Sequence, residues 1–354
     1  MAVSAYYKLY ESLRARIVDG ELQPGTKLDG LRTIASENGV SVITVSTAVD
    51  LLSREGYLDK IDRKGIYVTE PGSKKEVQDV AILVPLIVGG SDNDWGIQSV
   101  LPAIQNQLTK SHKRFSLHTF LESMEPARYL PAERLAAYNP DGLLVMAAYD
   151  YNYIAALAAL RIPSVAYDVN AYPFGIDSAF IDNVWAAAEL TRCLIEAGHS
   201  KIAYVGGPLP VGDRCSAFFD PAALERAEGY RISMKLHLPK EAVHLFHSDK
   251  RRSSEDMRLD ELKETFPECT AIVSESPLDL KEAGLEDLDQ AFFISKNQFN
   301  KKLKDKKAVV AVCDFKQLAV AATDLLIDRL KDPFSPVKRV VLEPEIKSNL
   351  TTIK

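Results

Sequence analysis

The stretch from residue 24 to residue 69, PGTKLDGLRTIASENGVSVITVSTAVDLLSREGYLDKIDRKGIYVT, decides the fold of the N-terminal part of this chain. It predicts two short helices that are joined by a tight turn and followed by a β-hairpin. The first helix has an apolar face made of Leu31, Ile34 and Ala35. Asn38-Gly39 ends this helix, because both residues tolerate the left-handed backbone that a helix end needs.

The second helix begins at once and carries the side chains that face outward. Ser41 is a good N-cap, and an apolar stripe at helical spacing faces inward through Val45, Ala48, Val49 and Leu52. The same spacing turns five side chains outward at the front of the helix: Val42, Ile43, Thr44, Ser46 and Thr47. A recognition helix presents such N-terminal residues to base edges. The hairpin has a basic tip, Arg63, Lys64 and Gly65, that is suited to lie along a phosphate backbone.

Two motifs in this region carry a family resemblance. PG-x-KL-x3-R-x2-A-x3-GVS-x2-TV-x2-A, residues 24 to 48, and EGYL, residues 55 to 58, closely resemble the winged helix-turn-helix of GntR-type bacterial transcription regulators. The resemblance implies that residues 1 to 70 form an α+β winged helix-turn-helix domain that binds DNA. It places Arg32 on a phosphate or base edge, Ser41 and Thr44 on the DNA backbone, and Gly65 at the wing tip in the minor groove.

The chain departs from that family at two places. Val42 and Ser46 stand where the family usually has arginine, and Asp29-Gly30 stands where it usually has Pro-Ser. Readout of guanine by those arginines is therefore lost, and we expect Val42 or Ile43 to contact thymine methyl groups instead. Residues 1 to 70 hold nine Lys and Arg against ten Asp and Glu, so a protein-binding role for this module is the alternative. DNA binding requires the basic residues to gather on one face: Arg14, Arg16, Arg32, Arg54, Arg63 and Lys64.

Composition sets the broad class. The chain has 354 residues, a hydrophobic fraction of 46% and a net charge of −6, which predict two or three domains and no global attraction to nucleic acid or anionic membrane. Four widely spaced cysteines without a CxxC pattern indicate reduced thiols. Neither a signal peptide nor a membrane-spanning run is recognisable. We therefore expect a cytoplasmic protein with no membrane association, no cofactor and no metal site.

The texture of the chain changes after residues 71 to 79, PGSKKEVQD, which we interpret as a linker. Short apolar runs then recur at 80–84, 115–121, 142–147, 164–167 and 201–205, and more loosely at 243–246, 270–273, 291–295 and 307–312. Helical patterns alternate with them at 97–109, 132–138, 152–160 and 184–197, and in the second half at 221–236, 255–265 and 316–331. This alternation predicts parallel sheets covered on both faces, arranged as two half-domains. Ligands of such sheets bind at the carboxyl ends of the strands.

A second resemblance covers residues 80 to 354. FIDNVWAAAELTRCLIEAGHSKIAYVGGP, residues 180 to 208, is similar to the V-x2-DN-x3-A-x4-HL-x2-GH-x-I-x2-I-G signature of LacI-type effector domains, which share the periplasmic sugar-binding-protein fold. The pattern R-x2-G-[FY] at 226–230 and the closing LEPEI-x3-LT at 342–351 fit it as well. The resemblance implies an α/β two-lobed domain that binds a small effector and forms a dimer. A GntR head joined to a LacI-type body is the arrangement of the arabinose-repressor subfamily.

A sugar-like ligand needs a flat aromatic ring and polar side chains that project from strand ends. After the first, third and fourth predicted strands, the candidates are Asp94, Trp95, Tyr149, Asp150, Asp168 and Asn170. Trp95 lies where the resemblance places a ligand-stacking aromatic. The alternative for Asp94 and Trp95 is a helix cap with the indole packed beneath it.

Three further effector contacts follow from the LacI-type resemblance. Arg226 matches the arginine that reaches the effector, and a guanidinium suits a diol or a carboxylate. Its alternative is a surface arginine paired with Glu225 or Glu228. Asp182 and Asn183 form the DN pair, where helix capping competes with ligand binding. Relatives usually end the strand at 291–295 with an Asp pair, whereas this chain has Ser295-Lys296-Asn297, so Asn297 or Lys296 is the remaining candidate.

Catalytic readings find little support in the sequence. His244 and His247 have a spacing that puts their rings on opposite faces of a strand, which is unsuited to a shared metal. Gly206-Gly207 lacks the rest of a phosphate-binding loop. We therefore predict a dimeric, non-enzymatic transcription regulator that binds a palindromic operator, represses a carbohydrate utilisation operon and is released by a monosaccharide or a derivative. The alternatives are a solute-binding protein, an enzyme with a regulatory head, and an activator with a non-sugar ligand.

Overall fold

The computed structural model describes residues 5–54, 56–61, 64–69, 77–86, 97–111, 114–123, 131–146, 150–206, 221–247, 260–281, 284–302, 307–333 and 335–350. It separates into two compact units, Met1–Gln78 and Asp79–Lys354. The linker predicted at residues 71–79 falls largely outside the described ranges. None of the helices within those ranges combines the length and the apolar character needed to cross a membrane.

The first unit contains the predicted pair of helices and the hairpin. Helices α1 (Ala5–Val18), α2 (Leu31–Asn38) and α3 (Val42–Arg54) precede the antiparallel strands β1 (Leu58–Ile61) and β2 (Gly65–Val68). Gly39 ends α2 in the left-handed conformation, with a φ of 62°. The backbone N–H of Thr44 donates to Ser41 Oγ at 3.1 Å, so Ser41 caps α3 as predicted. All four residues of the predicted stripe on α3 are fully buried.

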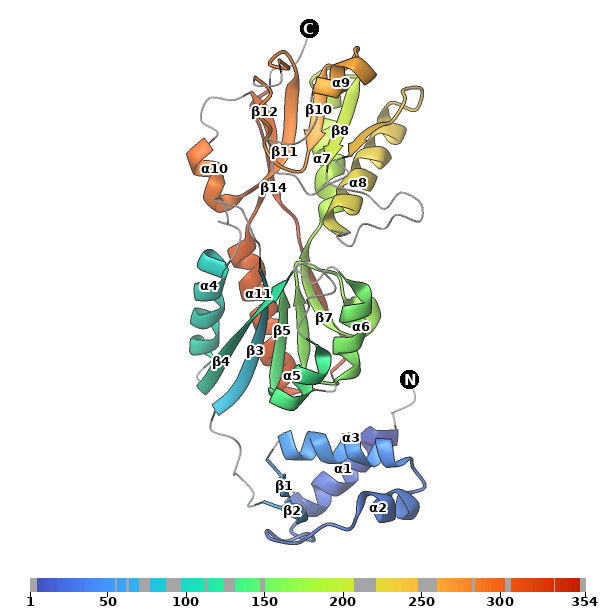
Figure 1. The fold of residues 1–354 in the computed structure, drawn as a ribbon, viewed down its shortest axis with the longest axis vertical. Coiled ribbons are helices and arrows are strands. Elements are labelled where there is room, and N and C mark those ends of the chain that lie inside the picture. Colours follow the sequence, from blue (N-terminus) through green and yellow to red (C-terminus); the bar gives the residue numbers. More distant parts are fainter. Residues whose placement is uncertain are drawn as a thin grey trace. The chain divides into compact units, whose positions relative to one another are not determined.

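The second unit has two lobes, each a sheet between helices (Figure 1). The first lobe contains β3 (Val77–Leu86), β4 (Arg114–Ser123), β5 (Gly142–Met146), β6 (Ser164–Tyr167), β7 (Asp177–Ile181) and β13 (Arg339–Leu342), in the order β13-β7-β6-β5-β3-β4. Helices α4 (Ile97–Lys110) and α11 (Phe315–Lys331) pack on one face. Helices α5 (Ala132–Tyr138) and α6 (Tyr151–Ala159), with the 3-10 turn η2 (Tyr172–Phe174), pack on the other.

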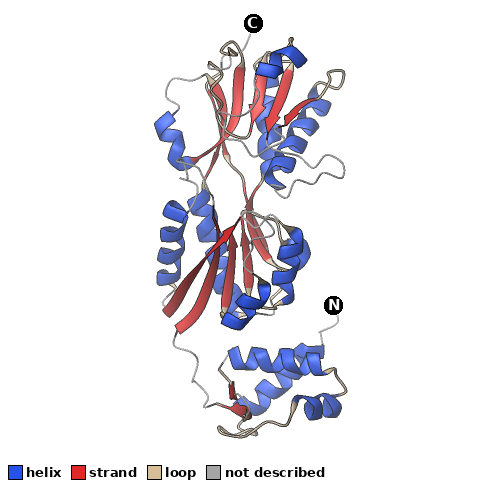
Figure 2. Cartoon of the chain, in the orientation of Figure 1, coloured by secondary structure: helices blue, strands red, loops and turns tan. Residues whose placement is uncertain are grey.

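The second lobe repeats this layering, as the secondary-structure colouring makes plain (Figure 2). Its strands are β8 (Ile202–Gly206), β9 (His244–His247), β10 (Ala271–Ser274), β11 (Asp289–Ser295), β12 (Ala308–Cys313) and β14 (Glu345–Ser348), in the order β14-β12-β11-β10-β8-β9. Only the edge strand β14 is antiparallel to its described neighbour. Helices α7 (Asn183–Glu196) and α8 (Pro221–His237) cover one face, and α9 (Asp260–Thr265) and α10 (Lys296–Lys302) cover the other.

The chain passes between the lobes three times. This corrects the predicted assignment of helices and strands to the two half-domains. The first crossover is 181–183, the second 313–315 and the third 342–345. The strand and helix predicted near 201–205 and 184–197 in the first half therefore belong to the second lobe, whereas the helix predicted at 316–331 in the second half packs on the first lobe. All three crossovers leave the carboxyl end of a strand. Strands β3, β5, β6 and β13 run parallel to β7, and β8, β9, β10 and β11 run parallel to β12, so the carboxyl ends of these strands lie at the crossover edge.

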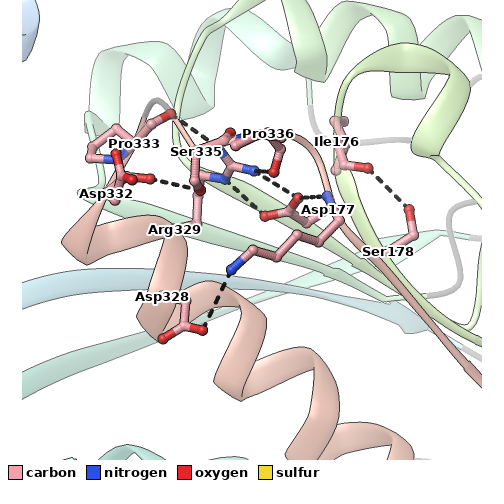
Figure 3. A network of polar contacts seen from close by, with 10 residues as sticks. Ile176, Asp177, Ser178, Asp328, Arg329, Asp332, Pro333, Ser335 and Pro336 are labelled. Carbon is pink, nitrogen blue, oxygen red and sulfur yellow. Dashed lines mark hydrogen bonds and ion pairs between the residues drawn. The ribbon is translucent and has the colours of Figure 1, made fainter.

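A buried ion pair closes the opposite end of the first lobe (Figure 3). Arg329, near the end of α11, donates from Nε and Nη2 to the two carboxylate oxygens of Asp177, each at 2.8 Å. The same guanidinium donates to the carbonyl oxygens of Pro333, Ser335 and Pro336, and the N–H of Lys338 donates to Asp177 at 2.6 Å. The side chains are 10% and 2% exposed. This network fastens the loop between α11 and β13 to the first residue of β7.

Candidate functional site

The front of α3 exposes an apolar tip. Ile43 is 70% exposed and Val42 is 42% exposed. Ser41 is exposed beside them, and its hydroxyl lies 2.8 Å from that of Thr44. These four residues form one small surface of two aliphatic groups and two hydroxyls. Such a surface can contact thymine methyl groups and backbone phosphates.

The next turn of α3 is occupied by internal contacts. Thr47 Oγ1 donates to the carbonyl oxygen of Ile43 at 2.9 Å, and Ser46 Oγ donates to Asp50 at 3.4 Å. Lys60 of β1 forms an ion pair with the same Asp50. The carboxylate on this face is therefore neutralised from within the unit. Ser46 and Thr47 remain predicted DNA contacts, although each hydroxyl already donates a hydrogen bond within α3.

The basic residues of the first unit have different surroundings. Arg32 is exposed at the start of α2, and Lys64 is exposed at the wing tip. The guanidinium of Arg14 lies 5.6 Å from the centre of the Tyr57 ring, and Arg16 pairs with Glu21 at 3.0 Å. Arg14 and Arg16 are thus engaged inside the unit, while Arg63 lies outside the described residues.

Gly65 at the wing tip has a backbone that requires glycine. Its φ is 126°, and a Cβ atom there would lie 2.6 Å from Cε of Lys27. Lys27 also forms a bridge to Tyr67 of β2 and lies 5.9 Å above its ring. The wing tip thus carries two ammonium groups, Lys27 and Lys64, of which the sequence analysis named one.

In the second unit, Arg226 lies at the crossover edge. Its Nε donates to Asn183 Oδ1 at 2.9 Å, and its guanidinium lies 4.3 Å from the centre of the Phe293 ring. Asn183 Nδ2 donates to Glu225 at 3.0 Å. Asn183 thus bridges Arg226 and Glu225 through its amide, and Glu228 pairs with Arg231 at 3.6 Å.

Three predicted contact residues have structural hydrogen bonds. The Asp182 carboxylate caps α7 by accepting from the N–H of Trp185 at 2.9 Å, and Asp150 caps α6 by accepting from Asn152 at 2.8 Å. Asn170 Oδ1 accepts from the N–H of Tyr172 at 3.3 Å. A carboxylate keeps further acceptor sites after capping, so these bonds leave room for a ligand contact.

Charges from both lobes act on one another at the crossover edge. Burial raises the pKa of the Cys313 thiol to about 12, while Arg226 lowers it and Asp168 raises it further. Burial also raises the pKa of Tyr151, with the charge of Glu225 as the second cause. Asp168 has a left-handed backbone, with a φ of 60°, at the end of β6. The charges of Asp168 and Arg226 thus both act on the Cys313 thiol at the second crossover.

The departure at 295–297 has a defined structure. The side chain of Lys296 donates to Asp314 at 2.7 Å, and Asp314 caps α11 by accepting from Gln317 at 3.0 Å. Burial pushes the pKa of Asp314 upward, but the hydrogen bonds from Lys296 and from backbone N–H groups lower it below its ordinary value. Asn297 lies half-buried in the first turn of α10. Asp314 was not predicted, because the sequence does not show that Lys296 would pair with an aspartate 18 residues later.

Three predicted effector residues, Asp94, Trp95 and Tyr149, lie outside the described residues. The residues of this region that sequence reasoning did not select are Phe293 and Asp314. Asp314 directly follows the end of β12, and that position was the available signal, whereas Phe293 lies within β11 and gave none.

Two family models match the chain. Bacterial regulatory proteins of the gntR family match residues 5–68. Periplasmic binding proteins and the sugar binding domain of the LacI family match residues 98–279, more than half of the chain. The chain belongs to this LacI-type family. Its N-terminal unit is a GntR-type winged helix-turn-helix, as the sequence predicted.

Relatives with known names include regulators. An arabinose metabolism transcriptional repressor of Geobacillus stearothermophilus is 24% identical over 263 residues, which are 68% of this chain and 69% of that protein. The HTH-type transcriptional repressor NagR of Bacillus subtilis (strain 168) is 34% identical over 76 residues. That match covers 22% of this chain and 31% of NagR, so it concerns the first unit.

Solved structures share the fold. A LacI family transcriptional regulator from Enterococcus faecium with bound ribose has a TM-score of 0.58 at 17% identity, covering 78% of this chain and 100% of that one. The complex of the transcriptional regulator CelR with cellobiose has a TM-score of 0.58 at 18% identity, covering 92% of this chain and 100% of that one. The two-lobed α/β architecture predicted from the sequence is confirmed.

Proposed function

We propose that this protein is a DNA-binding transcriptional repressor of a carbohydrate utilisation operon, which is released when a small sugar binds between the two lobes. The observation that carries the proposal is the joining of a GntR-type head to a LacI-type body whose Arg226 is hydrogen bonded to Asn183 at the first crossover. The relatives named as repressors, and the regulators solved with ribose and cellobiose, support the same assignment. The site of action is the cytoplasm, where the operator DNA is.

In this proposal the first unit reads DNA through the front of α3. Val42 and Ile43 contact thymine methyl groups, while the hydroxyls of Ser41 and Thr44 contact the backbone. Arg32 adds a phosphate or base contact, and Arg63, Lys64 and Gly65 place the wing along the minor groove. Each head reads one half of a palindromic operator, and a homodimer of bodies sets the distance between the halves.

The effector is held by groups that the two lobes bring to the crossover edge. The guanidinium of Arg226 donates to a pair of sugar hydroxyls, and the carboxylate of Asp168 accepts from others. The remaining proposed contacts are Asp182, Asp150, Asn170, Asn297, Asp94, Trp95 and Tyr149. Binding favours one arrangement of the lobes, and the heads that hang on them lose their fit to the operator.

A thermal-shift screen tests the ligand half of the proposal. Arabinose, ribose, xylulose, cellobiose and their phosphates are added to the full chain at concentrations that span the millimolar range. A sugar at about 100 times its dissociation constant stabilises the protein by about 2.7 kcal/mol. The Arg226→Met variant is expected to lose that shift, and Arg231→Met, an exposed arginine on the same helix, is expected to keep it. Equal shifts in both variants would contradict the proposed role of Arg226.

The competing function is an activator that answers to a non-sugar ligand. Lys296 favours it weakly, because an ammonium group replaces the carboxylates that relatives carry at this strand end. Its Nζ is already bound to Asp314, which leaves the site less basic than the sequence suggests. A shift with sugar phosphates or other anions and none with neutral sugars would favour this second function.

A further inference from the structure

Asn183 uses every hydrogen-bonding group of its side chain. The Nε–H of Arg226 donates to Oδ1 at 2.9 Å, and Nδ2 donates to Glu225 at 3.0 Å and to the carbonyl oxygen of Ile181 at 3.3 Å. The residue is 5% exposed. An amide that is buried and fully bonded is held in one orientation, because any rotation leaves a polar group unpaired.

A glycine on α8 explains why Arg226 reaches this amide. Gly229 follows Arg226 by three residues and therefore lies on the same face of the helix. A Cβ atom at Gly229 would lie 2.1 Å from the carbonyl oxygen of Val184 and 2.9 Å from Cβ of Ala187. The two helices thus meet at closest approach where α7 begins. The R-x2-G spacing sets Arg226 against the first residue of α7.

Asn183 also touches the connection between the lobes. Ile181 is the last residue of β7, and Asn183 is the first residue of α7, so the side chain spans the first crossover. The backbone N–H of Asp182 donates to the carbonyl oxygen of Leu342 at 2.9 Å, which joins the first crossover to the third. A displacement of Asn183 is therefore felt at two of the three crossovers.

We infer that Asn183 is a positioning residue that couples the guanidinium of Arg226 to the first crossover. A ligand that draws the guanidinium toward itself weakens or breaks its hydrogen bond to Asn183 Oδ1. The amide then moves, which alters the hydrogen bonds that Nδ2 donates to Ile181 and Glu225. The backbone of the first crossover changes conformation as a result. By thermodynamic reciprocity, the lobe arrangement that operator DNA selects changes the affinity for the ligand through the same bonds. The inference rests on the proposed role of Arg226 in effector binding.

Amide exchange without ligand tests the linkage itself. Asn183→Ala and Arg226→Met are both expected to speed exchange at residues 182–186, where the N–H groups of Trp185 and Ala186 bond to Asp182. Thr191→Val is the matched control, because it removes a buried side-chain bond on α7 to the Ala187 carbonyl that touches neither Arg226 nor a crossover. Exchange that is unchanged in Asn183→Ala and Arg226→Met would overturn the inference, whatever ligand the protein binds.

A double variant separates coupling from binding. Asn183→Asp with Glu225→Gln keeps an acceptor for Arg226 and a contact with position 225, but it loses the donor to Ile181. Where a sugar of the panel binds the wild type, we expect this variant to hold that sugar within about 3-fold of wild-type affinity. Its operator affinity should respond to the sugar by less than about a fifth of the wild-type factor, a loss within the usual range of coupling. The Glu225→Gln single variant is the control and should keep the wild-type response.

The outcomes separate the two ideas. A full operator response in the double variant would overturn the role of Asn183 while leaving sugar release intact. If no sugar of the panel acts on the wild type, the proposed effector fails, and the exchange experiment alone decides on the linkage. Faster exchange in Asn183→Ala, in Arg226→Met and in the double variant, but not in Thr191→Val, would then support it. A double variant that exchanges as slowly as the wild type would refute it.

Discussion

Ile43 is the residue on which base recognition depends most in this account, since it is 70% exposed at the front of α3. We expect Ile43→Ala to weaken operator binding about 5-fold, because loss of a methyl contact costs about 1 kcal/mol. The measurement is an anisotropy titration of DNA selected from a random pool by the wild type. Replacing the contacted thymine by uracil should cost the wild type the same factor and the variant nothing more.

Val18→Ala supplies the control for that titration. Val18 is 57% exposed at the end of α1, so its truncation removes a comparable aliphatic surface outside α3. If Ile43→Ala and Val18→Ala bind the operator equally well, Ile43 does not contact a base.

The Arg329–Asp177 pair predicts a second effect of a single residue. Arg329→Met would leave the Asp177 carboxylate buried without its partner, and such a loss costs about 3–5 kcal/mol of the free energy of unfolding. The urea midpoint of the variant measures it. Lys331→Met removes an exposed pair on the same helix and should change stability by less than about 0.5 kcal/mol. Similar losses in both variants would mean that water reaches Asp177 in the folded protein.

Local signals in the sequence identified the residues that make local contacts. Ser41 was predicted as an N-cap and Val45 as a core residue, and both features are confirmed by the structure. The position of Arg226 was taken from a resemblance. Its bond to Asn183 joins residues that are 43 positions apart and depends on the packing of α7 on α8, which no local pattern encodes.

At the scale of the element, the cap of α11 predicts an acid dependence. The pKa of Asp314 is lowered in the folded protein, so its carboxylate stabilises the fold above the ordinary value of 3.8. That stability is lost as the pH falls from this value through the lower pKa of the folded state. Asp314→Asn keeps a capping oxygen but cannot titrate, and its free energy of unfolding should fall less between pH 5 and about pH 2.

Lys296→Met checks the cause of that dependence. The variant removes the ammonium group that helps to lower the pKa of Asp314, and it should also show a shallower loss of stability in acid. Urea titrations at several pH values measure both variants. An acid profile equal to that of the wild type in both would show that the ion pair does not form in solution.

The sequence predicted those elements that bury a continuous apolar run or a helical stripe. It missed β13 and β14, because neither of these edge strands contains a buried residue. It also missed β7, which begins with the polar residues Asp177 and Ser178. Asp177 is buried only because Arg329 reaches it from α11. The assignment of α11 to the wrong half has a similar origin, because a crossover leaves no mark in hydrophobic periodicity.

At the scale of the whole molecule, the chain joins a GntR-type unit to a LacI-type unit. In the proposed function, a dimer of the LacI-type units sets the distance between two DNA-binding units on a palindromic operator. We expect a change of lobe arrangement to alter that distance without changing a base contact. Release by a sugar therefore should lower operator affinity while leaving the preferred half-site sequence unchanged.

The most direct measurement is the operator affinity of the full chain with and without the sugar that raises its melting temperature. We predict that the sugar raises the dissociation constant of the operator complex at least about 10-fold, a coupling of about 1.4 kcal/mol. The operator affinity of Arg226→Met should not respond to the sugar. An operator affinity that is the same with and without every sugar that binds, or an Arg226→Met variant that responds fully, would contradict the account.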